Sequence, residues 1–345
     1  MKSRLVRNAY WIVPTLLLAA CGGGGGGGGG TPPPATTTAS QLVITDSNAQ
    51  AVAAEVLETS TNIDAAQVGT GIVTAVQVET GGASNALLLA AVARDLLSKS
   101  TGPALATGAT VTRNCQFGGT LVVTDTSASA TVATAGDQFS VVANNCLDPL
   151  GNTGTQVLLN GTMTLTVVSG SFDSSSTTFP KNVTLRLVAT SFSVTQGGVK
   201  STSNGDLTIG IAEPSASNSN LSLSSASLGN TVEKSGVSHT ITLKDYTHSV
   251  NVTSTQATVS ITATVESNNV RFGSGVFNYQ LSTLSPIVIS SSGYTSGGLK
   301  VAASHSGLQL SVVPTNNFSL QVDTNGDGGF ESTSGVSRAQ LEALI

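Results

Sequence analysis

The sequence predicts a mainly β protein, either a large antiparallel β-meander or a β-sandwich, with a small N-terminal α-helical segment packed on it. Three observations lead to this prediction. After residue 103, apolar residues alternate with Ser and Thr at a period of two, which is typical of strands with one buried face. Clusters of Gly, Asn and Ser interrupt these runs about every 8–12 residues, as expected for successive antiparallel hairpins. Between residues 46 and 100, apolar residues instead recur at the helical period.

The helical segment, residues 41–102, is expected to contain three helices. Ser47 and Gln50 form a capping-box pattern before the first helix. Apolar residues spaced by four predict a middle helix around Ile72 and a third helix around Val92. The third helix is apolar around much of its circumference, which favours burial against a sheet; contact with a membrane is the alternative.

The clearest strand is "QATVSITATVE", residues 256–266, in which Ala, Val and Ile occupy one face and Ser and Thr occupy the other. The same alternation occurs at residues 163–167, 221–223, 308–312 and 318–322. Roughly fifteen such segments approach the limit for one open sheet, so we expect a sandwich or a sheet curled around the helices. The segment "LNGTMTLTVVSG" from Leu159 is similar to "SNGDLTIGIAEP" from Ser203, which indicates duplicated hairpins or simply similar strands. Near the C-terminus, Ser337 and Gln340 predict the capping box of a short helix.

The start of the chain has the organisation of a secretory signal peptide. Three basic residues precede an apolar run over residues 10–20, which closes on small side chains. This run is too short to cross a bilayer. Residues 22–30 are all Gly and residues 32–34 are all Pro, so we expect residues 21–40 to form a tether without a packed core.

The tetrapeptide Leu18-Ala19-Ala20-Cys21 resembles the lipobox of bacterial lipoproteins. The resemblance implies that the preceding peptide is removed and that Cys21 becomes an acylated N-terminal residue, which anchors the chain in a membrane. In proteobacterial lipoproteins an Asp after the cysteine favours the inner membrane, so the Gly that follows Cys21 implies the outer membrane. An ordinary signal peptide with a chance cysteine is the alternative. The predicted signal peptide, acylated tether, helical segment and β domain with a short C-terminal helix occupy residues 1–20, 21–40, 41–102 and 103–345.

The wider arrangement resembles uncharacterised β-rich bacterial lipoproteins, and this resemblance does not indicate a particular activity. Removal of residues 1–20 takes away three of the 14 basic residues and none of the 19 acidic ones, which leaves a formal charge of −8. This charge argues against nucleic acid as a partner. The expected partners are the membrane, through the lipid anchor, and an envelope protein, glycan or lipid.

Cys115 and Cys146 are expected to form a disulfide, because they are an even pair in an exported chain. A metal site is the weaker alternative, since neither cysteine has a second cysteine or a histidine at ligand spacing. Closing a loop of about 30 residues should stabilise the fold by roughly 3–4 kcal/mol.

The stretch "DTNGDGGFE" matches the first half of a calcium-binding loop, in which short oxygen side chains converge on a hard cation. The candidate ligands are Asp323, Asn325, Asp327, Gly329 and Glu331. The twelfth position of the loop is a Ser where an EF-hand has a Glu, and an Asp/Asn/Gly hairpin turn needs the same residues for conformational reasons. The stretch is therefore a possible calcium site or a turn alone, and no other cofactor is expected.

The sequence contains no recognised catalytic motif. On a regular strand His239 and Asp245 would share a face and His248 would point the other way, so these residues do not form a triad. We therefore expect a non-enzymatic envelope protein with a structural or binding role. The alternative is a carrier that holds a lipid or another small amphiphile in a cavity between the curled sheet and the helices.

Overall fold

The computed structural model describes residues 39–60, 85–100, 110–126, 132–150, 156–173, 178–314 and 316–344. These residues belong to one compact unit that spans Thr37–Ile345. The signal peptide, Cys21 and the predicted middle helix around Ile72 lie outside the described residues.

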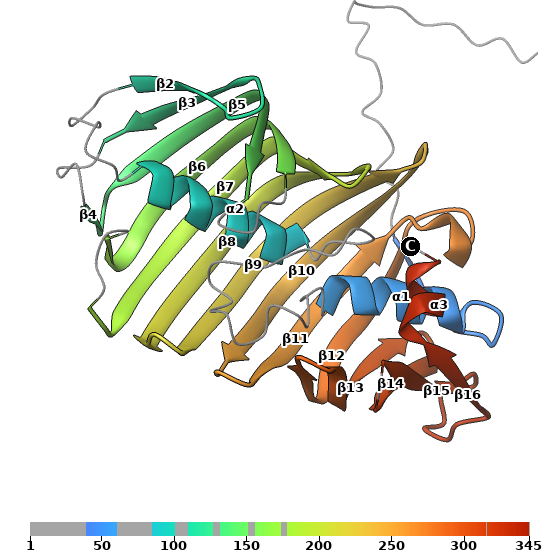
Figure 1. The fold of residues 1–345 in the computed structure, drawn as a ribbon. Coiled ribbons are helices and arrows are strands. Elements are labelled where there is room, and N and C mark those ends of the chain that lie inside the picture. Colours follow the sequence, from blue (N-terminus) through green and yellow to red (C-terminus); the bar gives the residue numbers. More distant parts are fainter. Residues whose placement is uncertain are drawn as a thin grey trace, which may run out of the picture. The chain divides into compact units, whose positions relative to one another are not determined.

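Sixteen strands in the described part of the chain form one sheet (Figure 1). Its order is β16-β15-β14-β13-β12-β11-β10-β9-β8-β7-β6-β5-β3-β2, with β4 paired to β6 and β1 paired to β12. Only the β1–β12 pair among them is parallel. The mainly β fold class is thus confirmed, and of the two predicted architectures the structure has the meander. The strands are β1 Ser40–Gln41, β2 Thr110–Asn114, β3 Thr120–Asp125, β4 Val132–Thr134, β5 Gln138–Pro149, β6 Gln156–Asp173, β7 Lys181–Gln196, β8 Val199–Ser215, β9 Asn218–Lys234, β10 Val237–Val252, β11 Gln256–Ser267, β12 Phe277–Ser290, β13 Gly293–Ala303, β14 Ser306–Val313, β15 Asn317–Asp323 and β16 Ser332–Ser337.

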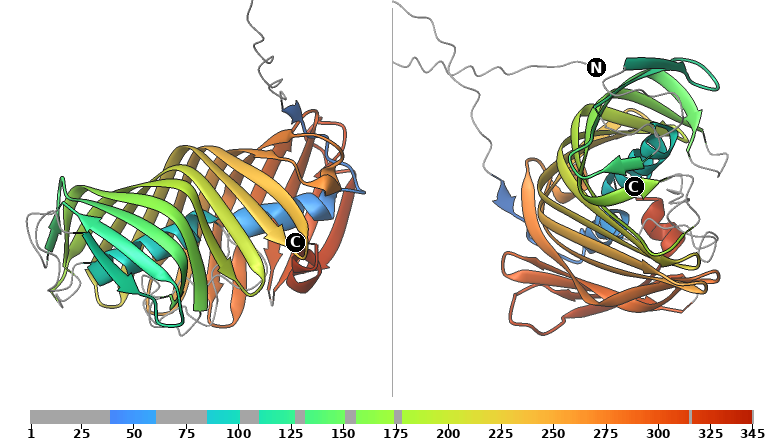
Figure 2. Two further views of the ribbon diagram at one scale, coloured as in Figure 1. Left: turned by 90° about the horizontal axis from the view of Figure 1, so that it is seen from above. Right: turned by 90° about the vertical axis from the view of Figure 1, so that its left-hand side faces the viewer.

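The sheet curls around two helices, α1 (Ala49–Ser60) and α2 (Asn85–Ser100), which lie on its inner face (Figure 2). Helix α1 contacts β11, β14 and β15, and helix α2 contacts β8 and β9. Apolar side chains of both helices are almost fully buried, among them Val52, Val56 and Leu87. The predicted burial of the third helix against a sheet is therefore confirmed. None of the helices in the described residues is long and apolar enough to span a membrane.

The two short helical elements lie toward the C-terminus of the chain. The 3₁₀ helix η2 (Val270–Phe272) precedes β12, and helix α3 (Arg338–Glu342) follows β16. The predicted capping box of α3 is present, because the Ser337 side chain accepts a hydrogen bond from the Gln340 amide and the Gln340 side chain accepts one from Ser337 N–H. The start of α1 differs from its predicted capping box, since the Ser47 hydroxyl lies 2.9 Å from the hydroxyl of Thr45.

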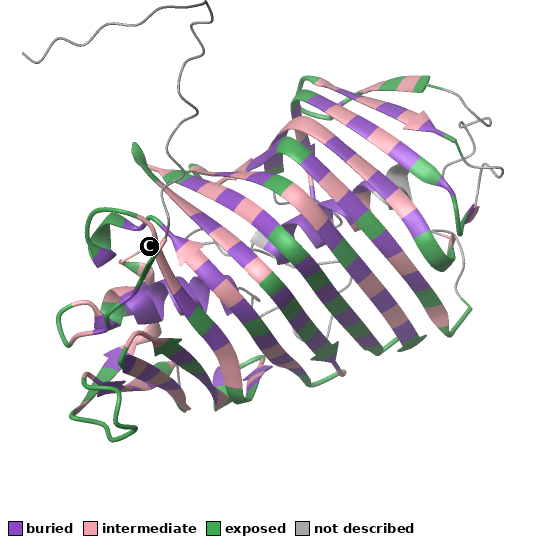
Figure 3. Cartoon of the chain, turned by 180° about the vertical axis from the view of Figure 1, so that it is seen from behind, coloured by how far each residue is buried: buried purple, intermediate pink, exposed green. Residues whose placement is uncertain are grey.

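The two faces of the sheet follow from the alternation in the sequence. In β11 the residues Ala257, Val259, Ile261, Ala263 and Val265 are all buried on the inner face, and the Ser and Thr residues between them point outward. Figure 3 shows the resulting bands of buried and more exposed residues along the strands. The core is therefore the space between this apolar inner face and the two helices.

The central strands are longer than the turn spacing of the sequence predicts, at 16 to 18 residues for β6 to β10. The Asn-Gly pairs of the two similar segments, predicted as duplicated hairpins or similar strands, lie at bulges inside strands. The Asn160 side chain accepts a hydrogen bond from Asn145 N–H (2.7 Å), and the Asn204 side chain accepts one from Ser191 N–H (2.7 Å). Asn145 and Ser191 both have a left-handed backbone, with φ of 48° and 47°. The similarity between the two Asn-Gly segments is thus a repeated bulge.

These bulges lie side by side across neighbouring strands. A Cβ on Gly161 would lie 2.2 Å from the carbonyl oxygen of Ser191, and a Cβ on Gly205 would lie 2.6 Å from that of Ser227. Register shifts occur at each of the pairs β5–β6, β6–β7, β7–β8 and β8–β9. Because a bulge bends its strand and increases its twist, this line of bulges explains how so many strands curl as one sheet.

Candidate functional site

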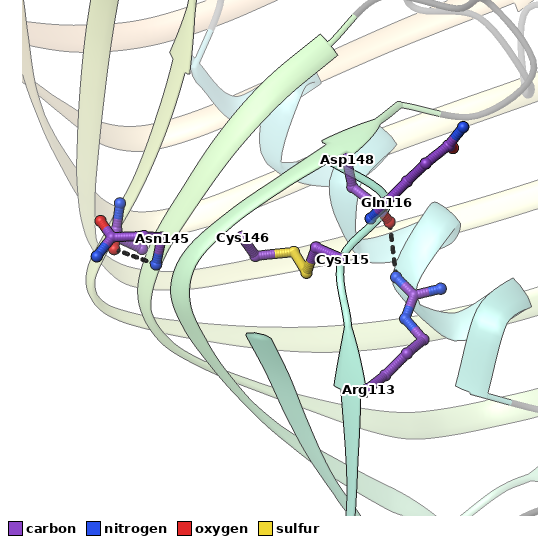
Figure 4. Close-up of a disulfide and its surroundings, with 7 residues drawn as sticks. Arg113, Cys115, Gln116, Asn145, Cys146 and Asp148 are labelled. Carbon is purple, nitrogen blue, oxygen red and sulfur yellow. Dashed lines mark hydrogen bonds and ion pairs between the residues drawn. A yellow bond between two sulfur atoms is a disulfide. The ribbon is translucent and has the colours of Figure 1, made fainter. Parts of the chain in front are cut away.

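The predicted disulfide joins Cys115, at the end of β2, to Cys146 in β5 (Figure 4). Their Cα atoms are 5.4 Å apart, and both side chains are buried. Asp148 supports the same loop, because it accepts hydrogen bonds from the Arg113 guanidinium (2.7 Å) and from Gln116 N–H (2.8 Å). The disulfide therefore ties the strands at one end of the sheet together.

The predicted calcium turn connects β15 to β16 and brings three of its candidate ligands together. One carboxylate oxygen from each of Asp323, Asp327 and Glu331 lies within 4.8 Å of the others. Asp323 accepts hydrogen bonds from the amides of Gly326 (2.6 Å) and Gly328 (2.9 Å). The turn is thus folded by its own side chains.

The remaining candidate ligands of this turn also take part in it. The Asn325 side-chain oxygen accepts a hydrogen bond from Asp327 N–H (2.8 Å), and Asn325 Nδ2 donates one to Glu331 (2.9 Å). The Gly329 amide donates to Asp327 (2.7 Å). This network serves a hairpin turn, and it also gathers negative charge where a cation would sit.

The histidines do not form a catalytic group with Asp245. The expectation that His239 and Asp245 share a face is wrong, because Asp245 has φ of 48° and the register with β11 shifts between Lys244 and Thr247. Before this bulge the odd-numbered residues face inward, so His239 lies on the inner side. After this bulge the even-numbered residues face inward, so His248 is buried on the inner face while Asp245 is exposed. His248 Nδ1 lies 3.0 Å from the Tyr246 hydroxyl.

Sequence reasoning missed two buried carboxyl groups, which belong to residues of helix α1. Glu55 is 1% exposed and accepts hydrogen bonds from Ser267 (2.8 Å), Asn269 (3.0 Å) and Tyr279 (2.8 Å). Burial raises the pKa of Glu55, against the smaller opposite effect of these three donors. The sequence contained a signal for this burial, because the helical period places Glu55 on the same face of the helix as its apolar residues.

Glu58 lies one turn further along α1 and is 5% exposed. Its Oε1 atom has no hydrogen-bond partner among the described residues. Burial, with the negative charge of Glu55 as the second cause, raises the pKa of Glu58 to about 8, and Lys234 acts in the opposite direction. Burial also lowers the pKa of His248, which lies on strand β10, to about 4. The inner face therefore holds ionisable groups that favour their neutral forms.

The outer face of the sheet carries two shallow grooves that sequence reasoning did not identify. The larger has a volume of about 600 Å³ and crosses β6 to β10, and the smaller has a volume of about 350 Å³ and extends to β11. Thr184, Ser222 and Ser249 line both of them. Alternation places these side chains outward, and in the larger groove the small residues Gly210 and Ala212 of β8 lie between the polar residues of β7 and β9.

The chain matches no protein-family model, no curated protein and no solved structure. The sequence and the geometry described above are therefore the basis of the functional argument.

Proposed function

We propose that this chain is a lipid-anchored protein of the bacterial outer membrane with a non-enzymatic structural or binding role. The lipobox resemblance at Cys21 and the Gly- and Pro-rich tether after it support the anchor. The disulfide between Cys115 and Cys146 supports an oxidising compartment outside the cytoplasm.

The observation that carries the binding role is the outer face of the long sheet. Its exposed side chains across β7 to β10 are mainly Ser, Thr and Asn, and the grooves hollow this face. An enzymatic role has less support, because His248 is buried under the helices and Asp245 points to the opposite side of the sheet. A broad polar surface suits recognition more than chemistry.

The anchor is tested by intact-mass analysis of the protein extracted from the membranes of a Gram-negative host. We expect a chain that begins at Cys21 and carries added acyl mass. The Cys21→Ser variant is the control, and it should lack both the acyl mass and the cleavage. A wild-type chain that still begins at Met1, or that begins later without acyl groups, would overturn the anchor.

The carrier hypothesis remains the second proposal, because the inner face is apolar and curled. In the described residues α1 and α2 contact this face directly, which favours the binding role on the outer face. Native mass spectrometry of the purified protein distinguishes the two proposals. A co-purified lipid that is lost on unfolding would favour the carrier.

We also propose that the β15–β16 turn binds calcium weakly and becomes more rigid when it does. The three gathered carboxylates support this. Calorimetric titration should show binding at millimolar calcium, and Asp327→Asn should weaken it, whereas Glu342→Gln in α3 should not. Absence of heat at millimolar calcium would show that the turn is held by its hydrogen bonds alone.

A further inference from the structure

The larger outer groove presents hydrogen-bonding side chains in rows that cross the strands. Asn220 of β9 pairs in register with Asn251 of β10, and Ser222 pairs with Ser249. Asn182 of β7 continues the row of amides, with a small Ala of β8 between them. Because neighbouring strands are about 4.8 Å apart, the polar groups of β9 and β10 lie one strand spacing apart, and those of β7 lie two spacings from β9.

The amides of this groove are free to bind a ligand. Among the described residues, the side chains of Asn182, Asn220 and Asn251 make no hydrogen bond. Asn160 and Asn204 differ, because their side chains hold the bulges. The three groove amides are therefore exposed and available to a ligand.

The chemistry of the lining narrows the class of ligand. No ionisable side chain lines the groove. Next to it, Arg186 is paired with Asp206 across β7 and β8. The groove would thus offer a charged ligand no side chain of opposite charge, whereas a neutral ligand needs none.

Two classes of neutral ligand are disfavoured: an extended peptide by the position of the groove, and a lipid by its lining. An extended peptide binds sheets by adding to an edge, whereas the strands here have neighbours on both sides that already satisfy their backbone groups. A lipid needs exposed apolar side chains, whereas Val183, Leu221 and Val250 beneath the groove are buried on the inner face.

We propose that the groove binds a neutral, extended glycan whose sugar units run across the strands. Sugar hydroxyls donate and accept hydrogen bonds, as amides and hydroxyls do, and the sugar repeat of an extended β-linked glycan is close to the strand spacing. A volume of about 600 Å³ is within the range of small-molecule sites. No aromatic ring lines the groove, so each sugar is bound weakly and affinity grows with chain length. This proposal rests on the binding role proposed above and names its ligand.

The test is a titration of the full-length protein, labelled with ¹⁵N-asparagine and held in detergent micelles. The probes are cellotetraose and chitotetraose, both neutral and β-linked, and tetragalacturonate is the anionic comparison. We expect the side-chain amide signals of Asn182, Asn220 and Asn251 to shift at millimolar concentrations of a neutral probe. The shift should be smaller with the corresponding disaccharide and absent with tetragalacturonate.

Two double variants complete the experiment. Asn220→Ala/Asn251→Ala should weaken binding at least tenfold. Gln309→Ala/Gln321→Ala, a cross-strand amide pair on β14 and β15 outside the groove, should leave it unchanged. Unmoved signals with both neutral probes, equal binding of the anionic probe, or equal loss in the two variants would each overturn the glycan proposal. Because the readout does not depend on acylation, failure here is distinct from failure of the anchor.

Discussion

The inner and outer faces of the sheet are made by the same strands, yet polar groups are buried on the inner face and exposed to solvent on the outer face. On the inner face Glu55, Glu58 and His248 are buried, and their environment favours the neutral forms. On the outer face Asn220 and Asn251 stay in contact with solvent and have no partner among the described residues. The comparison shows that one alternating pattern can bury ionisable groups on one face and leave uncharged amides exposed on the other.

The largest expected effect is the loss of stability on disrupting the bulges between neighbouring strands. Gly161→Ala should destabilise the protein by about 4 kcal/mol, because φ of 99° is strained for Ala and the new Cβ would meet the Ser191 carbonyl. Urea unfolding measures the loss. Gly335→Ala on β16 is the matched control, since its Cβ would meet nothing within 4 Å, and it should change stability by less than about 0.5 kcal/mol. Equal effects of the two substitutions would show that the bulges are not critical.

A smaller effect should sharpen the chemistry of the inner face at high pH. The pKa of Glu58 is raised from 4.5 to about 8, so the folded state holds this proton more tightly than the unfolded chain does. The contribution of Glu58 to the free energy of unfolding should therefore fall as pH rises from about 4.5 to about 8. Glu58→Gln should remove this fall and be more stable than wild type by about 3 kcal/mol at pH 8. Glu233→Gln, an exposed change on β9, should keep the wild-type profile.

Unfolding curves measured from pH 4 to pH 9 test this prediction. A wild-type profile that stays parallel to that of Glu58→Gln over the whole range would contradict it, because the buried carboxyl would then titrate as it does in the unfolded chain.

His248 should produce a pH dependence of opposite sign. Its pKa is lowered from 6.5 to about 4, so the unfolded chain binds the proton more tightly. The contribution of His248 to stability should then be lost as pH falls from about 6.5 to about 4, so that over this range the free energy of unfolding of wild type changes unfavourably by about 2 kcal/mol relative to that of His248→Asn. His305→Asn, at an exposed turn, serves as the control. Thermal unfolding at pH 7 and pH 4 measures the difference between the two proteins, and equal changes in wild type and His248→Asn would disprove it.

The smallest effect is expected on the outer face. Ser224→Ala should change stability by less than about 0.5 kcal/mol, because the side chain is exposed and has no partner in the described residues. Leu223→Ala, one position earlier and buried, should cost about 3 kcal/mol. A similar cost for the two changes, measured by urea unfolding, would mean that the outer face is covered in solution.

Local pattern determined much of this protein. The alternation around Val259 set the strand and its buried face, the capping box at Ser337 set the start of α3, and the spacing in "DTNGDGGFE" set the β15–β16 turn. Cys115 and Cys146 could be paired by elimination. Each of these features depends on residues near one another in the chain or on a choice among very few partners.

Only the tertiary structure decided the rest. The bulge at Asp245 reverses which residues of β10 face the core, and the donors to Glu55 come from residues more than 200 positions away. The larger groove is lined by residues of five strands at once. A period of two says which side chains share a face, but strand register, bulges and curvature arise from contacts between distant segments, which alternation alone does not encode.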